Sequence, residues 1–243
     1  MTSLVGSSAI VTGASRGIGR AIALAMASAG ARVALVADSD SSKVCKSITE
    51  AGGDAKSYVA DVSDQDQVIK LFKDVQYDFK SFNVLVNNAG VGFFGPHETI
   101  HPEKIERMVK TNLLAPMVLI QMTLRHLKKS EGFIINMASA AALEPGRFGG
   151  AYGATKAGLH QFGQSLFAEV RKSGVRVVTL YPDMTMTPFY DETDFAPHKD
   201  HTCHIAPECV ADAVAQAINQ REGTVITQIV LKPQRIGVER KRN

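Results

Sequence analysis

The sequence predicts a single α/β domain built on a doubly wound parallel sheet. Three observations lead to this prediction. Strand-like and helix-like segments alternate along the whole chain, residues 1–243. The strand-like segments are continuously apolar, which indicates strands buried on both faces of a parallel sheet. The length is that of one large domain, with no internal repeat.

The expected elements follow one another in the order strand, helix, strand. Strands are expected over residues 8–12, 32–37, 55–60, 84–86, 133–137, 175–180 and 224–231. Helices are expected over residues 17–29, 41–51, 64–78, 152–173 and 207–220, with one long or broken helix over 102–111 and 113–128. Glycines at positions 30, 52 and 53 end the first two helices. Right-handed crossovers between such strands produce the doubly wound arrangement.

Residues 188–204 form the least regular segment, and we interpret them as a mobile substrate loop. The loop contains His198, His201, Cys203 and His204, which could be metal ligands. A lid over the substrate or plain solvent exposure is favoured over a zinc site, because the chemistry inferred below needs no metal.

Composition excludes several functions. The net charge of +3 is too small to indicate a nucleic-acid partner, and the basic end Arg240-Lys241-Arg242 is interpreted as a solvated tail. No apolar run approaches the ~20 residues that span a bilayer. We interpret the three scattered cysteines as reduced thiols: Cys45, Cys203 and Cys209. We therefore expect a cytoplasmic protein without nucleic-acid or membrane partners.

A glycine-rich turn lies between the first expected strand and the first expected helix. Its glycines are Gly13, Gly17 and Gly19, within the run from Thr12 that also includes Ser15, Arg16 and Ile18. Glycines allow tight turns and let backbone N–H groups approach a pyrophosphate at a helix N-terminus. A plain strand-to-helix turn is the alternative, but the flanking elements favour a dinucleotide site.

The choice between the two nicotinamide dinucleotides stays open. Asp38, near the end of the second strand, could bond the adenosine ribose and repel a 2′-phosphate. Arg16 could instead hold that phosphate, unless it is simply a solvated cation. Asp61, followed by Val62 at the end of the third strand, could accept a hydrogen bond from the adenine amino group or belong to a helix N-terminal region.

A serine, a tyrosine and a lysine past the middle of the chain have the spacing of a proton-transfer site. Tyr152 and Lys156 share one helix face, so a cationic lysine could lower the pKa of the phenol from about 10. Ser139, at the end of the fifth strand, could hold the oxygen of a substrate. Taken singly, Tyr152 and Lys156 could be a surface pair of an amphipathic helix, and Ser139 could serve only in the packing of small residues. Together with the glycine turn, the three residues imply hydride chemistry on a carbonyl or an alcohol.

These motifs identify a family. The chain resembles the short-chain dehydrogenases/reductases over essentially its full length, and within them the branch that reduces carbonyls and 3-oxoacyl thioesters. The matching motifs are Thr12–Gly19, Asn87-Asn88-Ala89-Gly90, Thr111-Asn112-Leu113, Ser139, Tyr152-x-x-x-Lys156 and the Pro182 segment.

The resemblance implies a Rossmann-type sheet of seven strands with the active site at the strand C-termini. It implies that Asn88, Ala89 and Gly90 line the adenosine side of the cofactor, and that Asn112 holds a water linking Lys156 to solvent. Residues of the Pro182 segment, Thr185 and Thr187, are expected on the nicotinamide side, with the Thr187 hydroxyl on the carboxamide or in a local turn. It also implies a homodimer or homotetramer joined through the helices at 113–128 and 152–173, and favours NADP slightly over NAD.

The sequence departs from the family at two places. Asp183 follows Pro182 where the family usually has glycine, so it must adopt another conformation or narrow the site. The usual acid-Gly-Gly near the C-terminus is missing, and a basic tail follows instead.

The sequence therefore predicts an NAD(P)(H)-dependent oxidoreductase that interconverts a ketone, such as a 3-oxoacyl thioester, and a secondary alcohol. Two other readings stay open: a cofactor-binding sensor or scaffold without turnover, and a structural subunit that binds no nicotinamide. Apolar residues are expected to wall the small-molecule substrate pocket: Phe93, Phe94, Met184, Met186, Phe189, Tyr190 and Phe195.

Overall fold

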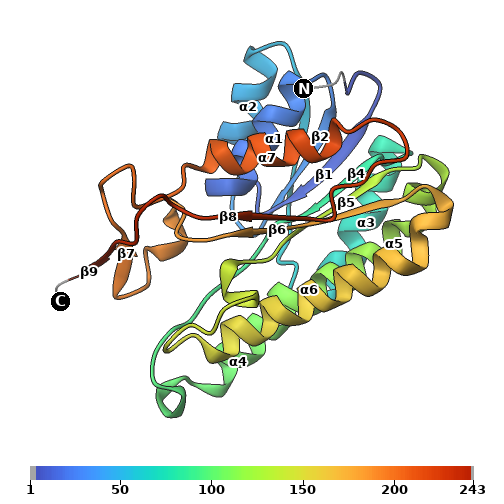
Figure 1. Ribbon diagram of the computed structural model, residues 1–243. Helices are drawn as coiled ribbons and strands as arrows, with labels where there is room; N and C mark the ends of the chain where they lie inside the picture. The colour runs from blue at the N-terminus through green and yellow to red at the C-terminus, as the bar shows by residue number, and fades with distance from the viewer. Residues whose placement is uncertain (1–3, 242–243) are drawn as a thin grey trace.

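A computed structural model describes residues 4–241 as one α/β domain around a seven-stranded sheet (Figure 1). Every neighbouring pair of strands in this sheet is parallel. The predicted doubly wound, Rossmann-type sheet is therefore confirmed. In sheet order the strands are β3 (Asp54–Val59), β2 (Arg32–Ala37), β1 (Ser8–Thr12), β4 (Val84–Asn87), β5 (Phe133–Met137), β6 (Arg176–Pro182) and β8 (Gln228–Leu231).

Helices cover both faces of the sheet, which explains why its central strands are apolar on both sides. One face carries α1 (Gly17–Ser28), α2 (Ser42–Glu50) and α7 (Pro207–Ile218). The other face carries α3 (Gln65–Phe79), α5 (Ala115–Lys129) and α6 (Gly150–Val170). None of the helices within residues 4–241 combines the length and the apolar character needed to cross a lipid bilayer.

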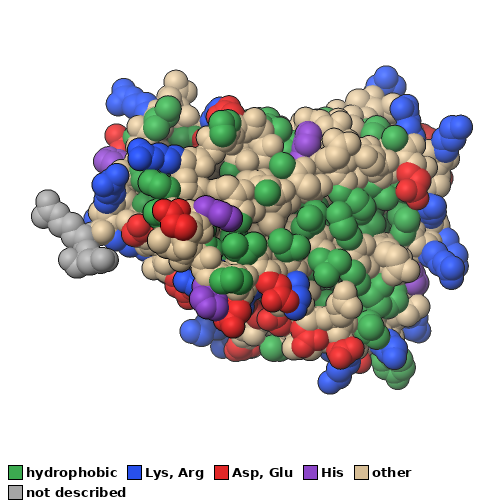
Figure 2. Space-filling model, turned by 90° about the horizontal axis from the view of Figure 1, so that it is seen from below, with side chains coloured by type: hydrophobic (Ala, Val, Ile, Leu, Met, Phe, Trp, Pro, Cys, Tyr) green, Lys and Arg blue, Asp and Glu red, His purple; other side chains and the backbone are tan. Residues whose placement is uncertain are grey.

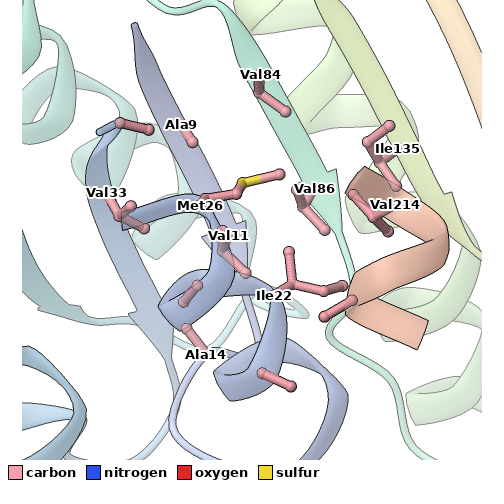
Figure 3. Close-up of a cluster of buried hydrophobic side chains, with 14 of the residues drawn as sticks. Ala9, Val11, Ala14, Ile22, Met26, Val33, Val84, Val86, Ile135 and Val214 are labelled. Carbon is pink, nitrogen blue, oxygen red and sulfur yellow. The ribbon is translucent and has the colours of Figure 1, made fainter. Parts of the chain in front are cut away.

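The core between α1, α7 and the sheet fixes the position of the first helix. Figure 3 shows Ile22 and Met26 of α1 with Val214 of α7 beside Val86 and Ile135 of the central strands. All five side chains are almost completely buried. Each such burial contributes roughly 1.5–3 kcal/mol, so the N-terminus of α1 is held firmly at the end of β1.

The strand order reverses between β1 and β4. The chain passes from β1 to β2 on one side and later returns to β4 on the other. The carboxyl ends of the strands beside such a reversal form a crevice. Thr12, Ala37, Asn87, Met137 and Pro182 are the last residues of their strands and mark its rim.

The long helix expected over 102–128 is broken, which was one of the two alternatives. A π turn at Lys110–Leu114 separates α4 (Pro102–Val109) from α5. Pro116 lacks the N–H that would close an α-helical bond to the carbonyl of Asn112, which favours a break at this point. The break therefore contains Asn112.

Other boundaries differ slightly from the prediction. The last strand of the sheet begins at Gln228 rather than at residue 224, and α6 begins at Gly150, two residues before Tyr152. Residues 188–204 contain a 3₁₀ turn at Pro188–Tyr190 and the strand β7 (Phe195–Pro197). The mobility of this segment stays a prediction.

The C-terminal segment is more ordered than the sequence suggests. A strand that was not predicted, β9 (Val238–Arg240), pairs antiparallel with β7 (Figure 1). Arg240 and Lys241 are exposed, as expected of a solvated end, but this end is not free, because both residues contribute backbone contacts to residues 194 and 195. Arg242 lies outside the described residues.

Candidate active site

The predicted site residues gather in one cleft at the carboxyl ends of the strands. The cleft measures about 1190 Å³, its open mouth included. Of the predicted catalytic and cofactor-binding residues, only Gly19 and Asn112 do not line it. Those that do are Gly13, Ser15, Arg16, Gly17, Ile18, Asp38, Asp61, Val62, Asn88, Ala89, Gly90, Ser139, Tyr152, Lys156, Pro182, Thr185 and Thr187.

The glycine turn between β1 and α1 forms one wall of the cleft. Gly13 and Gly17 have φ of +65° and +55°, in the left-handed region that favours glycine. Gly19 lies behind the turn, where a Cβ would stand 2.2 Å from the carbonyl oxygen of Gly13. Arg16, the N-cap of α1, offers no side-chain cap to the helix. The first N–H groups of α1 are therefore available to an anion.

Asn88 and Thr12 hold the turn in place from the neighbouring strands. The amide of Asn88 donates to the carbonyl of Thr12 over 2.9 Å and to that of Gly13 over 3.3 Å. The hydroxyl of Thr12 accepts from the backbone of Asn88 and of Ala89 over 2.9 and 3.0 Å. The backbone of 88–90 thus lines the cleft while the Asn88 side chain braces the glycines.

Two acidic residues, Asp38 and Asp61, also line the cleft. Asp38 is exposed and directly follows β2. The hydroxyl of Ser39 donates to that of Ser15 over 3.1 Å and links this strand end to the glycine turn. Asp61 accepts the backbone N–H and the hydroxyl of Ser63 over 2.8 and 2.7 Å. The N-cap of α3 is Asp64 and not Asp61.

Ser139, Tyr152 and Lys156 meet in the same cleft. Tyr152 and Lys156 lie one turn apart on α6 and are only 9% and 4% exposed. The Ser139 side chain lies near the Tyr152 phenol and lowers its pKa. The Lys156 ammonium lies 5.8 Å from the centre of the Tyr152 ring and donates to the carbonyl of Met137 over 2.8 Å. The predicted trio therefore converges.

Burial controls the protonation of both helix residues. It raises the pKa of Tyr152 to about 12, against a smaller lowering by the nearby Ser139 side chain. It lowers the pKa of Lys156 to about 8. The expectation that Lys156 lowers the pKa of Tyr152 is not met in the protein alone, because the loss of hydration outweighs the nearby charge. At neutral pH Tyr152 is a neutral phenol, the form that donates a proton.

Asn112 connects the loop after β4 to α6. Its side chain donates to the carbonyl of Val91 and to the hydroxyl of Thr155, over 2.8 and 3.1 Å. Its Oδ1 accepts the N–H of Val91 over 2.9 Å. The side chain is therefore fastened mainly to protein. A Cβ on Gly90 would stand 3.3 Å from the Asn112 Oδ1 and 3.4 Å from the Lys156 Nζ. Both of these polar atoms therefore lie beside Gly90.

The segment after β6 forms the opposite wall. Asp183 needs no left-handed backbone, because it is not among the described residues with positive φ. Its N–H donates to the carbonyl of Leu231 over 3.0 Å and its Oδ1 accepts from Met184 over 2.8 Å. Asp183 therefore fits by a different conformation, with its side chain lining the cleft.

Thr185 and Thr187 follow along the same wall. Thr185 is buried, and its hydroxyl donates to the carbonyl of Asp183 over 2.9 Å. Thr187 caps the 3₁₀ turn at Pro188–Tyr190 by accepting from Phe189, and its side chain lies 3.2 Å from a Cβ placed on Gly17. Thr187 thus closes the cleft against the glycine turn while serving as a local cap.

Aromatic rings enclose Tyr152 on the substrate side. The ring centres of Phe94 and Phe189 lie 5.2 and 5.9 Å from that of Tyr152. Phe195 lies 5.2 Å from Phe94, and Tyr190 lies 5.1 Å from Phe189. Four of the seven predicted wall residues therefore form one shell.

The other three predicted wall residues lie outside this shell. Phe93 contacts Lys104 and Met108 instead. Met186 is exposed. The carbonyl of Met184 accepts a hydrogen bond from the backbone of Ile205.

The histidines of the 188–204 segment do not converge. The ring of His204 bonds the carbonyl of His198 over 2.8 Å, Cys203 is buried, and His201 is exposed. Within residues 4–241, no group of three or more His, Cys, Asp or Glu side chains is arranged to hold a metal ion.

Several lining residues were not predicted as site residues, Arg107 and Thr111 among them. They reach the cleft from α4 and the π turn. They lie one helical turn apart and Thr111 directly precedes Asn112, so the helical spacing before Asn112 was the signal that could have found them.

Comparison with known proteins places the chain among relatives of one kind. A family model described as short chain dehydrogenase matches residues 7–196. An uncharacterized oxidoreductase of Staphylococcus epidermidis is 33% identical over 226 residues, covering 93% of this chain and 96% of the relative.

Two solved structures extend the comparison. A metagenomic short-chain oxidoreductase in complex with NADP is 35% identical, with a TM-score of 0.83 and coverage of 96% and 99% of the two chains. A 3-ketoacyl-(acyl-carrier-protein) reductase of Brucella melitensis, complexed with NADH, is 25% identical with a TM-score of 0.83 and coverage of 95% and 98%.

Proposed function

The chain belongs to the short-chain dehydrogenase/reductase family, and on that premise we propose that it interconverts a ketone and a secondary alcohol with a bound nicotinamide dinucleotide. The observation that carries the proposal is the meeting of Ser139, Tyr152 and Lys156 at one end of a cleft whose other end is the glycine turn. A proton-transfer group and a pyrophosphate cradle in one cleft suit hydride chemistry on a carbonyl.

The cleft fits a dinucleotide. The glycine turn is a cradle that side chains would fill, since a Cβ on Gly19 would meet the carbonyl of Gly13 at 2.2 Å. The uncapped N–H groups of α1 would bind the pyrophosphate, with Asp38, Asp61 and the 88–90 backbone around the adenosine. Pro182, Thr185 and Thr187 would hold the nicotinamide end.

The residues of the chain would then move the proton. A nicotinamide dinucleotide held in this cleft would supply or accept the hydride and, when oxidised, would add positive charge near the phenol. Ser139 donates a hydrogen bond to the substrate oxygen and fixes it beside Tyr152. In the reduction, Tyr152 gives its proton to that oxygen. Its raised pKa keeps the phenol protonated at neutral pH but opposes loss of the proton, so the Lys156 cation is needed to stabilise the developing phenolate. A water between Asn112 and Lys156 would return the proton.

The aromatic shell supports an uncharged substrate with apolar substituents. Phe94, Phe189, Tyr190 and Phe195 provide apolar and π surface, and no arginine or lysine belongs to the shell. Simple ketones and 3-oxoacyl thioesters both fit this description, and the similar Brucella protein is a 3-ketoacyl reductase.

NADP is the dinucleotide we favour, as in the similar metagenomic enzyme. Arg16, exposed and lining the cleft, supports a 2′-phosphate site. Asp38 opposes it.

We also propose a homo-oligomer in the cytoplasm. Figure 2, which views the molecule from the side of α4, α5 and α6, shows hydrophobic side chains gathered on this face. Leu113, Met117 and Phe162 are only half-buried, and Val109 is 42% exposed, which suits contact with a second copy of the chain. All three cysteines are free, in keeping with a reducing compartment.

Turnover by a Tyr152→Phe variant tests the function. The purified chain should oxidise NADPH or NADH with a panel of apolar ketones. Loss of the hydroxyl should lower kcat by roughly 10²–10⁴-fold while the dinucleotide Kd stays within about twofold, because only the proton donor is removed. Tyr77→Phe, on the 85% exposed tyrosine of α3, is the matched control and should keep full activity.

Two results would count against the proposal. Dinucleotide binding without hydride exchange in the unaltered chain would favour a sensor or scaffold. Unchanged turnover in Tyr152→Phe would remove Tyr152 from the reaction.

A further inference from the structure

The end of the chain lies along the loop that forms the substrate wall. We name residues 235–241 the tail segment. Its strand β9 pairs with β7, so that Arg240 stands opposite Phe195 (Figure 1). The backbone of Lys241 donates to the carbonyl of Asp194, and that of Arg235 to the carbonyl of Thr202, each over 2.8 Å. The tail segment therefore spans much of the 188–204 loop.

Side chains add to this pairing. The Lys241 ammonium donates to the carbonyl of Asp191 over 2.9 Å and also to the carbonyl of Tyr190. These carbonyls end the 3₁₀ turn at Pro188–Tyr190, where a cation is favourable. Glu239 accepts from the backbone of Lys199 over 3.3 Å.

Gly237 packs so closely that it has no room for a side chain. A Cβ there would stand 2.9 Å from the sulfur of Cys203 and 3.0 Å from the Cβ of His198. Its φ is not in the left-handed region, so the constraint is steric. The tail segment and the loop are thus in direct contact along their length.

The loop residues held by the tail segment are those that surround Tyr152. Tyr190, whose carbonyl bonds Lys241, packs on Phe189 and Phe195 at 5.1 and 5.6 Å. Phe189 stacks directly on Tyr152, while Phe195 reaches it through Phe94. A tail segment that holds residues 190 and 195 therefore also holds Phe189 and Phe94, the two rings beside Tyr152.

We propose that the tail segment is a positioning element of the substrate pocket, which holds the aromatic shell against Tyr152 and thereby sets the affinity for the carbonyl substrate. This inference rests on the proposed function. Residues 235–241 do not line the cleft that receives the dinucleotide. Loosening the tail segment should therefore raise KM for the carbonyl and leave dinucleotide binding unchanged.

A Gly237→Val substitution tests the proposal by forcing β9 away from the loop. The matched control is Gly146→Val, because a Cβ on Gly146 meets nothing within 4 Å. Hydrogen exchange is followed at the amides of Asp191 and Thr193, which bond the carbonyls of Pro188 and Tyr190. Exchange should accelerate by ~10-fold or more in Gly237→Val only, and KM for an apolar ketone should rise by ~5-fold or more.

Lys241→Met tests the same contact with a smaller change, since it removes the ammonium and keeps the chain length. KM should rise while kcat and the dinucleotide Kd stay within about twofold, and Lys241→Arg, which keeps a donor, should restore KM. Lys46→Met is the control, because Lys46 pairs only with Glu50 on the exposed side of α2.

Unchanged exchange at residues 191 and 193 in Gly237→Val would overturn the proposal, as would a parallel loss of dinucleotide affinity. The exchange measurement needs no turnover. A chain without ketone reductase activity would therefore defeat the proposed function while the exchange rates still decide whether the tail segment holds the loop.

Discussion

Asp38 and Arg16 line the same end of the cleft, and their charges favour opposite dinucleotides. A carboxylate at the end of β2 accepts hydrogen bonds from ribose hydroxyls and repels a 2′-phosphate. A guanidinium at the glycine turn attracts that phosphate and can bond it twice. Both side chains are exposed, so water and salt screen each of them, and geometry decides between them.

Substitution of these two residues separates their effects. We expect the unaltered chain to bind NADPH more tightly than NADH, and Arg16→Ala to weaken NADPH binding by ~10-fold with little change for NADH, since only the phosphate contact is lost. The measurement is the Kd of each dinucleotide by fluorescence titration. Asp38→Ala should change NADPH binding only modestly. A sharp rise from negligible NADPH affinity in Asp38→Ala would show that the chain is built for NAD.

Residue roles could be predicted where neighbours in sequence define them. Tyr152 and Lys156 meet because one helical turn separates them. The partners of Asn112 lie 21 and 43 residues away, and Thr187 and Gly17, which lie close together, are 170 positions apart in the sequence. No local pattern specifies such contacts. The pKa of Tyr152 likewise depends on its burial, which the fold decides.

Among the elements, the turn between β1 and α1 carries the tightest steric constraint. Gly19 occupies the first turn of α1, and the carbonyl of Gly13 and the amide of Asn88 approach it from behind. Because Asn88 directly follows β4, the neighbour of β1 in the sheet, any shift at Gly19 passes to both sides of the cleft.

Gly19→Ala should therefore lower stability and dinucleotide binding together. A Cβ at 2.2 Å from a backbone oxygen forces the backbone to move, which costs on the order of 1–3 kcal/mol. Urea unfolding and dinucleotide titration measure the two effects. Gly150→Ala is the control, since a Cβ there meets nothing within 4 Å at the start of α6. Equal stability of the two variants would contradict the geometry of the turn.

The central strands β1, β2, β4 and β5 were predictable because each is a largely apolar run. The edge strand β3 is not such a run, since it contains Asp54, Lys56 and Ser57. β7 and β9 were not predictable, since each has three residues and gains its stability from the other, across more than forty residues of chain. Their pairing also explains why the basic end of the chain is not free. Short strands of this kind depend on tertiary contacts more than on propensity.

At the scale of the whole molecule, burial of Lys156 in the candidate active site lowers the free energy of unfolding at neutral pH. Its pKa falls to about 8 in the folded protein, against about 10.5 in an unfolded chain. Between these values the unfolded chain binds more protons than the folded one. Stability therefore rises with pH across this window, the reverse of a lysine held by a carboxylate.

Comparison with Lys156→Met isolates this contribution. Between pH 7.5 and 9.5 the free energy of unfolding of the unaltered chain should rise by about 2 kcal/mol relative to Lys156→Met, as measured by urea unfolding at each pH. The range ends below pH 10 because burial also raises the pKa of Tyr152 to about 12, so ionisation of this phenol in the unfolded chain lowers stability above pH 10. The exposed Lys46→Met should follow the unaltered chain at both pH values. A difference between the chain and Lys156→Met that stays constant or falls with pH would show that burial does not lower the pKa of Lys156 in the folded protein.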